Sequence, residues 1–309
     1  MKYLALVGLV LVGTRLDGQC SSGNAQVLAA CNAAVDAFKT FQPLAGVAVS
    51  GGNPVIGTAK PLGGLGHLFV SARVNAVKAA IPNPDTAGAS IDGVVPAPVI
   101  EGGIGLYPGT AGGFLAIDAL ASAVLLPTGL DKLSVDPDAS KVGGYALGLG
   151  YGVRVGVLDG AFPVPAVSVS VMRRSLPRIR YGQLGAAVGT GDAFELDTDL
   201  KATNVRVAAS WRFVLLDLAA GFGFDKYTGT GAFRYYNNPP TASRDTVSLD
   251  LDNSRQVLFA NAGLSLSMLK LVGEIGYQTG KDQNLSVNYS DFDPKAGHVF
   301  GGVGVRFNF

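Results

Sequence analysis

The sequence predicts an all-β fold, a closed antiparallel β-barrel of about ten strands that spans a membrane. Glycine makes up 43 of the 309 residues, and only 15% of residues are charged, against roughly a quarter in typical soluble domains. Beyond the N-terminus, no apolar run reaches the length of about 20 residues that a membrane-spanning helix needs. Apolar residues instead alternate with small or polar ones, which is typical of strands with one face in lipid.

Residues 1–19 resemble a secretory signal. Met1-Lys2 supplies a positive start, and the apolar run that follows, residues 3–13, is too short to span a membrane. We therefore divide the chain into a signal peptide (1–19), an N-terminal helix and connector that is a candidate plug (20–65), and a barrel (66–309). Cleavage before Cys20 would leave Cys20 and Cys31 together in an oxidising compartment, where a disulfide is expected. Cleavage after Ala25 would leave Cys31 alone.

Residues 24–40 form the one convincing helix in the pattern. Val27, Cys31, Val35 and Phe38 recur at helical spacing, and we expect Pro43 to end the helix. Residues 44–65 are rich in glycine and proline and suit a connector. We expect the helix to lie near or inside the barrel lumen.

The alternation of apolar residues with period two begins at His67. Short links alternate with long ones, as expected when turns are short on the periplasmic side and long outside. Counting 178–190 or 231–252 as further spanning strands would raise the number of strands to 12–14. The predicted strands are 66–77, 98–107, 114–125, 142–157, 164–174, 198–213, 216–226, 256–268, 271–280 and 297–309.

Several charged residues share the phase that faces away from lipid. A charge in the bilayer would cost several kcal/mol, about 2–4 for Arg or Lys at its centre, so these side chains should line the lumen. They form either an ion-paired interior or the charge ladder of a pore, and the small interior of a ten-stranded barrel favours ion pairs. Inward glycines, such as Gly148 and Gly221, suggest that the helix approaches the wall closely. The predicted lumen residues are Arg73, Glu101, Asp118, Arg154, Arg206, Arg212, Asp217, Glu274 and Arg306.

The chain ends in an alternating apolar segment, in which Val303, Val305 and Phe307 lead in steps of two to the terminal Phe309. This segment resembles the C-terminal β-signal of bacterial outer-membrane proteins, which end in an aromatic residue. The resemblance covers the last strand only. It implies that the protein is located in the bacterial outer membrane, in contact with its lipid, and that the barrel-assembly machinery is a partner during biogenesis.

Little in the sequence points to catalysis. The chain has two histidines, His67 and His298, and no nucleophile motif, so we expect no enzyme, no metal and no cofactor. With 24 Lys and Arg against 23 Asp and Glu, no nucleic-acid partner is expected. The leading hypothesis is a channel or transporter for small solutes that the N-terminal segment narrows. The alternatives are a non-conducting structural or adhesion barrel acting through its outer loops, and a lipid-acting enzyme. Whether a transported solute would be polar or fatty stays open.

Overall fold

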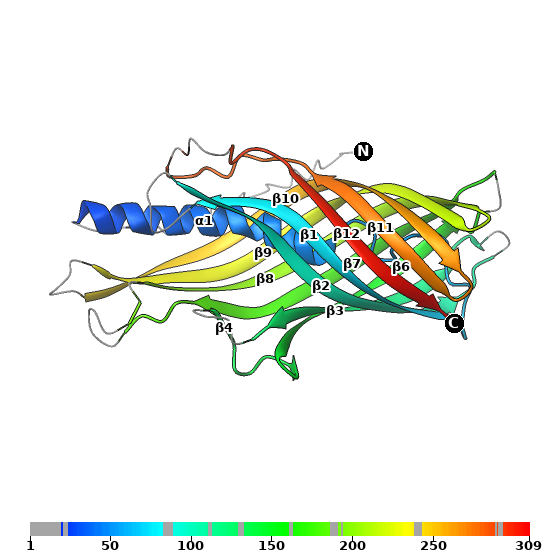
Figure 1. Cartoon of the computed structure of the whole chain (residues 1–309), viewed down its shortest axis with the longest axis horizontal. Helices are drawn as coiled ribbons and strands as arrows, with labels where there is room; N and C mark the ends of the chain where they lie inside the picture. The colour runs from blue at the N-terminus through cyan, green and yellow to red at the C-terminus, as the bar shows by residue number, and fades with distance from the viewer. Residues whose placement is uncertain are drawn as a thin grey trace, which may run out of the picture.

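The chain folds into one antiparallel barrel with a helix along its interior (Figure 1). The predicted signal peptide, 1–19, lies outside the described residues. The computed structural model describes residues 20, 24–82, 89–110, 113–128, 133–160, 163–185, 191–192, 194–237, 243–287, 289 and 293–309.

Within the described residues, ten strands form the wall, as predicted. Each strand pairs with the next, and β12 pairs with β1, with Val303 opposite Val74, so the ring is closed. Two short strands, β4 (Leu133–Val135) and β5 (Lys141–Val142), lie in the link between β3 and β6. The wall strands are β1 (Leu68–Pro82), β2 (Ser90–Tyr107), β3 (Ile117–Pro127), β6 (Tyr145–Leu158), β7 (Ala166–Tyr181), β8 (Phe194–Phe213), β9 (Leu216–Asn237), β10 (Ser243–Leu266), β11 (Leu269–Gln278) and β12 (His298–Asn308).

The outer face of the wall is apolar and the inner face is polar. On β1, Val70 and Val74 are 45% and 44% exposed, whereas Ser71 and Arg73 are buried inside. The same alternation repeats around the ring, so a band of exposed valine, leucine and phenylalanine encircles the barrel. Pairing of β12 with β1 closes the ring, so neither of these strands is left as an open edge, and lipid is the solvent that such a band requires. The protein is therefore a transmembrane barrel of the outer-membrane type.

The described residues include no helix with the length and apolar character needed to cross a membrane.

The two ends of the barrel differ. At one end the turns are tight: β8 and β9 are joined by Val214 and Leu215, and the Leu68 amide meets the carbonyl of Phe309 at 3.0 Å. The long links lie at the other end, which we assign to the outside of the cell.

The predicted strands are too short at this outer end. Residues 231–252 do not form extra spanning strands, because they continue β9 and β10 beyond the membrane as one extended hairpin.

The helix α1 (Ala25–Ser50) is longer than predicted. It begins where the Asn24 side chain accepts the Gln26 amide at 2.9 Å, but Pro43 lies inside it and does not end it. A proline within a helix costs about 3 kcal/mol because it removes one hydrogen bond and crowds the preceding turn. Burial of residues 44–50 against the inside of the wall offsets this cost. With its amide nitrogen turned toward the helix, Gln283 donates to the freed Lys39 carbonyl at 2.6 Å.

The helix lies inside the barrel, as expected from the sequence. It runs from the outer mouth toward the middle of the lumen (Figure 1). Leu44, Val47 and Val49 pack there against Tyr227 and Phe259 of the wall in one apolar cluster.

Candidate functional site

The connector that follows α1 fills the rest of the lumen. Every residue from 51 to 59 is buried, and Val55, Ile56 and Ala59 have no exposed surface. At the periplasmic end, the Leu62 amide donates to the carboxylate of Asp118 on β3 at 3.2 Å. Residues 24–62, called the plug below, thus occupy the lumen from the outer mouth to the periplasmic end.

Two arginines of the wall hold the C-terminal end of the helix. Arg73 on β1 donates to the Ser50 carbonyl at 3.0 Å. Arg206 on β8 donates to the carbonyls of Gly51, at 3.0 Å, and Gly52, at 2.7 Å. The last carbonyls of a helix lack partners within the helix and carry partial negative charge, so cations are favourable there. The wall thereby caps the helix that it encloses.

A carboxylate of the wall also binds the backbone of the plug, through amides rather than carbonyls. Glu274 on β11 accepts the amides of Gly52, at 2.7 Å, and Asn53, at 2.9 Å. The Asn261 side chain donates to the same carboxylate at 2.7 Å. Arg73 lies 3.6 Å from Glu274, so the charges compensate each other. Arg73, Arg206 and Glu274, called the clamp below, therefore grip the backbone of the plug, and hydrogen bonds to charged groups contribute about 1.5–3 kcal/mol each.

A second set of polar contacts links wall strands to one another. Glu101 on β2 pairs with Arg73 at 3.0 Å and with Arg174 on β7 at 2.8 Å, across the lumen. Arg174 also donates to Asn204 at 2.7 Å, and Asn204 donates to Asp225 at 2.8 Å. Since Arg174 touches wall residues only in these bonds, it differs from the clamp arginines.

Tyr227 joins this network to the helix. Its hydroxyl donates to Asp225 at 2.6 Å and receives a bond from Gln278 at 2.8 Å, while Arg206 pairs with the same aspartate at 3.0 Å. The tyrosine ring lies against Gly46 so closely that a Cβ at that position would overlap it. The ring therefore packs directly against the helix backbone at Gly46.

The periplasmic end has ion pairs of its own. Arg154 and Asp118 approach to 2.7 Å, and both are buried. Lys270 lies 2.8 Å from Asp217 and 3.4 Å from the Gly57 carbonyl of the plug. These contacts anchor the connector below the clamp.

Eight of the nine predicted lumen residues are buried inside the barrel. The exception is Arg212, whose side chain is 61% exposed because it stands next to the last residue of β8, at the periplasmic rim. It still reaches back to Asp217 at 2.9 Å. Arg306 lies with its guanidinium 4.6 Å from the centre of the Phe69 ring. The eight buried residues are Arg73, Glu101, Asp118, Arg154, Arg206, Asp217, Glu274 and Arg306.

Sequence reasoning missed five buried charges of the wall strands, one of which, Asp197, lies just before a predicted strand. Arg174 sits at the predicted end of its strand, and Lys270 falls in a segment that was expected to be a turn. Asp225 and Arg255 lie near the outer ends of predicted strands. Asp225 had the inward phase within its predicted strand, and extending the phase by one residue past the start of the strand predicted at 256–268 would have found Arg255.

The inward glycines mostly accommodate the wall's own side chains rather than the helix, contrary to expectation. A Cβ at Gly223 would meet Arg206 at 2.6 Å, and one at Gly150 would meet Arg174 at 2.7 Å. The helix makes a close approach at Gly231, where a Cβ would lie 2.6 Å from the Phe38 ring. Large inward side chains of neighbouring strands thus lie across the glycines.

The outer half of the helix is fastened in two ways. Cys20 and Cys31 form a disulfide, and Cys31 packs with Phe38 against the extended β9–β10 hairpin. Opposite the hairpin, the Asp36 carboxylate accepts the amide of Ser286, at 2.8 Å, and that of Val287, at 3.0 Å. Burial raises the pKa of Asp36, and these two bonds oppose the rise only in part.

The two histidines lie at opposite ends of the barrel. His67 is exposed in the turn before β1, and His298 begins β12 at the outer end. In the part of the chain that the structure describes, no three His, Cys, Asp or Glu side chains gather as a metal site would require.

No family model matches the sequence, and no curated protein matches it. Among solved structures, the translocator domain of the autotransporter NalP from Neisseria meningitidis is similar at 13% identity and a TM-score of 0.44, covering 89% of this chain and 98% of that one. The N-terminal β-barrel domain of Pseudomonas aeruginosa OprF is similar at 10% identity and a TM-score of 0.27, covering 80% and 99%. Neisserial surface protein A gives 10% identity, a TM-score of 0.29, and coverage of 79% and 99%.

The closed ring, its apolar outer band and its polar interior carry the assignment of the chain. They make it an outer-membrane β-barrel whose lumen is occupied by residues of its own N-terminal region.

Proposed function

We propose that the protein is an outer-membrane channel for small solutes that its own plug closes at rest. The observation that carries this proposal is the chemistry of the contact between plug and wall at mid-depth. There the clamp binds backbone carbonyls and amides of residues 50–53 through hydrogen bonds. Water can replace every one of these bonds if the plug moves.

The polar wall supports the same proposal. The desolvation cost of buried ion pairs is about as large as the energy they return, so a permanently sealed barrel would be at least as stable with an apolar interior. A wall lined by Arg73, Glu101, Arg206 and Glu274 has a different property. It tolerates both the docked plug and a column of water.

The test compares two buried arginines of the inner wall that differ in their hydrogen-bond partners. Arg206→Gln removes charge-assisted bonds to the plug, whereas Arg174→Gln removes bonds between wall strands. Each substitution leaves one acidic partner behind, which makes the pair a matched control. In planar bilayers we expect the Arg206→Gln variant to open at least tenfold more often than wild type, since the loss of about 1.4 kcal/mol changes an equilibrium tenfold. The Arg174→Gln variant should behave like wild type.

Deletion of residues 24–59 gives the limiting case. The deleted barrel should conduct steadily, because the segment that fills the lumen is gone. A folded deletion variant with no more current than wild type would overturn the proposal, as would equal opening of the two arginine variants.

The second candidate is a non-conducting barrel that acts through its outer part. It is favoured by one observation, the extension of β9 and β10 beyond the membrane around an apolar cluster that includes Phe233 and Leu249. Such a rigid platform suits adhesion or partner binding. Absence of current from the folded deletion variant would favour this function.

We also make a proposal about how the barrel is assembled. Val303, Phe307 and Phe309 are 69%, 43% and 58% exposed toward lipid, and Val305 shares their face. We propose that the barrel-assembly machinery reads this face before β12 joins β1. The proposed function includes no catalysis and no cofactor.

A further inference from the structure

The wall of the barrel is incomplete on one side of its outer half. β2 and β3 pair from Tyr107 and Ile117 up to Val99 and Val124. Beyond that point, β2 continues to Ser90 with β1 as its partner, and no described residue pairs with its other edge. The outer part of β3 pairs with β6 only.

The same hairpin also separates from β7. The last pair between β6 and β7 joins Leu149 to Ser175, although both strands continue outward. Further out, β4 in the link between β3 and β6 pairs with residues 179–181 of β7, and Figure 1 shows the rest of the hairpin tip leaning away from the barrel. The opening between the free edge of β2 and the edge that β7 and β4 form together is called the lateral notch below.

Prolines surround the lateral notch. Pro96 lies on the free stretch of β2, with Pro98 next to the last pair with β3. Pro127 ends β3, and Pro177 lies where the β7–β8 register is interrupted. Proline has no backbone N–H, so it occurs at strand edges and blocks pairing there. These residues maintain the opening in the wall.

An apolar crevice lies behind the lateral notch, between wall and helix. The helix contributes Phe41, Ala45, Ala48 and Val49 to its lining. Its volume is about 90 Å³, well below the roughly 300–1,000 Å³ of pockets that enclose a drug-sized ligand. The wall side of the crevice is lined mainly by Val95, Ala97, Leu126, Leu176, Ile179 and Leu200.

The lateral notch opens at the level of the membrane. Val77 faces the crevice residue Val95 across the β1–β2 pair, and Val74 and Ala76 beside it point outward within the apolar band. The first outward charge on β1 is Lys78, one residue further out. The hydrocarbon of the outer leaflet therefore reaches the mouth of the crevice.

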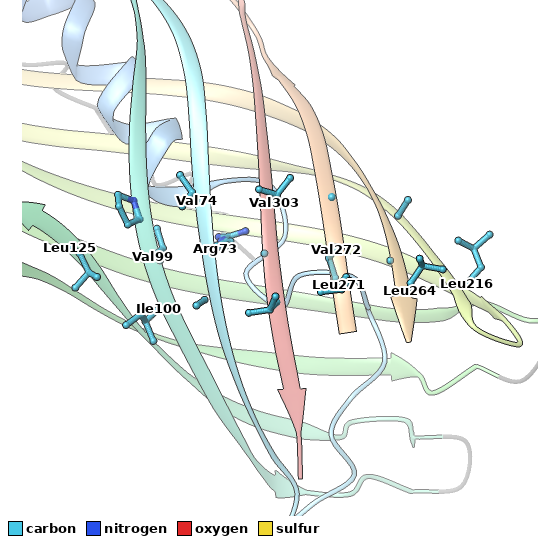
Figure 2. A pocket seen from close by; sticks show the side chains of 17 residues that line it. Arg73, Val74, Val99, Ile100, Leu125, Leu216, Leu264, Leu271, Val272 and Val303 are labelled. Carbon is cyan, nitrogen blue, oxygen red and sulfur yellow. The ribbon is translucent and has the colours of Figure 1, made fainter. Parts of the chain in front are cut away.

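The lipid-facing surface leads directly to this mouth. An apolar groove runs across the outer face of β1, β2 and β10–β12, where Val74, Ile100 and Val303 line it (Figure 2). Its lining includes Pro98 and Leu125, the neighbours in sequence of the crevice residues Ala97 and Leu126. These neighbours point to opposite faces of the wall, so the groove and the crevice lie on its two sides and meet where β2 and β3 separate.

We propose that the crevice binds the acyl chain of an outer-leaflet lipid, which enters sideways through the lateral notch and lies against the helix. Its small volume and apolar lining fit only the end of one unbranched chain and exclude bulky rings. Lipid binding in the crevice does not require the plug to move. This proposal can therefore be correct or wrong independently of the proposed channel function.

Fluorescence quenching by brominated acyl chains tests the proposal. The chain has one tryptophan, which Trp211→Phe removes. In that background, Phe41→Trp puts a fluorophore into the crevice. The control is Phe300→Trp, since Phe300 is 2% exposed, points inward and lies opposite Val77 at the height of the crevice. We expect phospholipids with brominated chains to quench the Phe41→Trp variant at least twofold more than the control.

A second change blocks the crevice. Ala97→Leu adds a larger side chain to its lining and should bring the quenching of the Phe41→Trp variant down to the control value. Equal quenching of the two tryptophan variants, or quenching that Ala97→Leu leaves unchanged, overturns the proposal. Should Phe41→Trp not fold, native mass spectrometry on the remaining variants decides. Wild type retains a lipid that the Ala97→Leu variant loses, and equal retention overturns the proposal.

Discussion

At the scale of single residues, glycines set how closely the plug and wall can approach. Tyr227 cannot move away from Gly46, because its hydroxyl is bound by both Asp225 and Gln278. The sequence could not reveal this contact, since the two residues lie far apart in the chain and carry no shared pattern. The inward phase of charged residues, by contrast, was visible, because each strand identifies its own lipid face.

Gly46→Ala tests the fit between helix and wall. The added methyl would strike the fixed ring of Tyr227, and overpacking of this kind costs typically 1–3 kcal/mol. We expect a lower free energy of unfolding, measured by urea titration in detergent micelles, and more frequent channel openings. Gly273→Ala is the control, because a Cβ there meets no atom within 4 Å. Equal effects of the two substitutions would contradict the account.

At the scale of elements, burial decides where the helix and the strands end. The proline rule failed for α1, since the residues after Pro43 fill a lumen that only the folded barrel creates. The strands were placed correctly in the membrane, where lipid imposes strict alternation. Beyond it β9 and β10 continue with Thr, Gly and Asp, as in Thr228, Gly229 and Asp250, and the apolar stripe that marks a lipid-facing strand is lost.

The contact between α1 and the last outer loop should depend on pH. Because the pKa of Asp36 is raised in the folded state by burial, the folded protein binds this proton more tightly than the unfolded chain. The resulting stability is fully present below the ordinary Asp value of about 3.9 and is lost as the pH rises through the raised pKa. The melting temperature of wild type relative to Asp36→Asn should therefore rise on going from about pH 7 to about pH 4. A difference that stays constant, or falls, would refute this assignment.

At the scale of the whole molecule, the sequence was enough to predict the barrel wall but not how deeply the connector fills the lumen. Signal, alternation and the final strand together predicted an outer-membrane barrel of about ten strands, with 12–14 as the alternative, and the described residues confirm the barrel with ten wall strands. The depth to which the connector enters the lumen depends on Arg73, Arg206 and Glu274 converging from three strands. Such convergence has no signature along a single segment.

The unplugged barrel should prefer anions. Buried cationic side chains outnumber acidic ones in the part of the inner wall that spans the membrane, as the residues themselves show. In a salt gradient, the reversal potential of the 24–59 deletion variant should correspond to an anion-to-cation permeability ratio above one. A permeability ratio below one would contradict this prediction of anion preference. The cations are Arg73, Arg154, Arg174, Arg206, Arg255, Lys270 and Arg306, and the acids are Glu101, Asp118, Asp217, Asp225 and Glu274.

The path of the plug fixes which side of the membrane each end of the folded domain faces. Ten strands are an even number of crossings, so β1 begins and β12 ends on the periplasmic side. The plug adds one further crossing inside the ring, which makes the total odd. Asn24 and Phe309 therefore lie on opposite sides of the membrane. The N-terminal end of α1 must therefore cross the membrane through the lumen, either before the seam between β1 and β12 closes or through the closed ring.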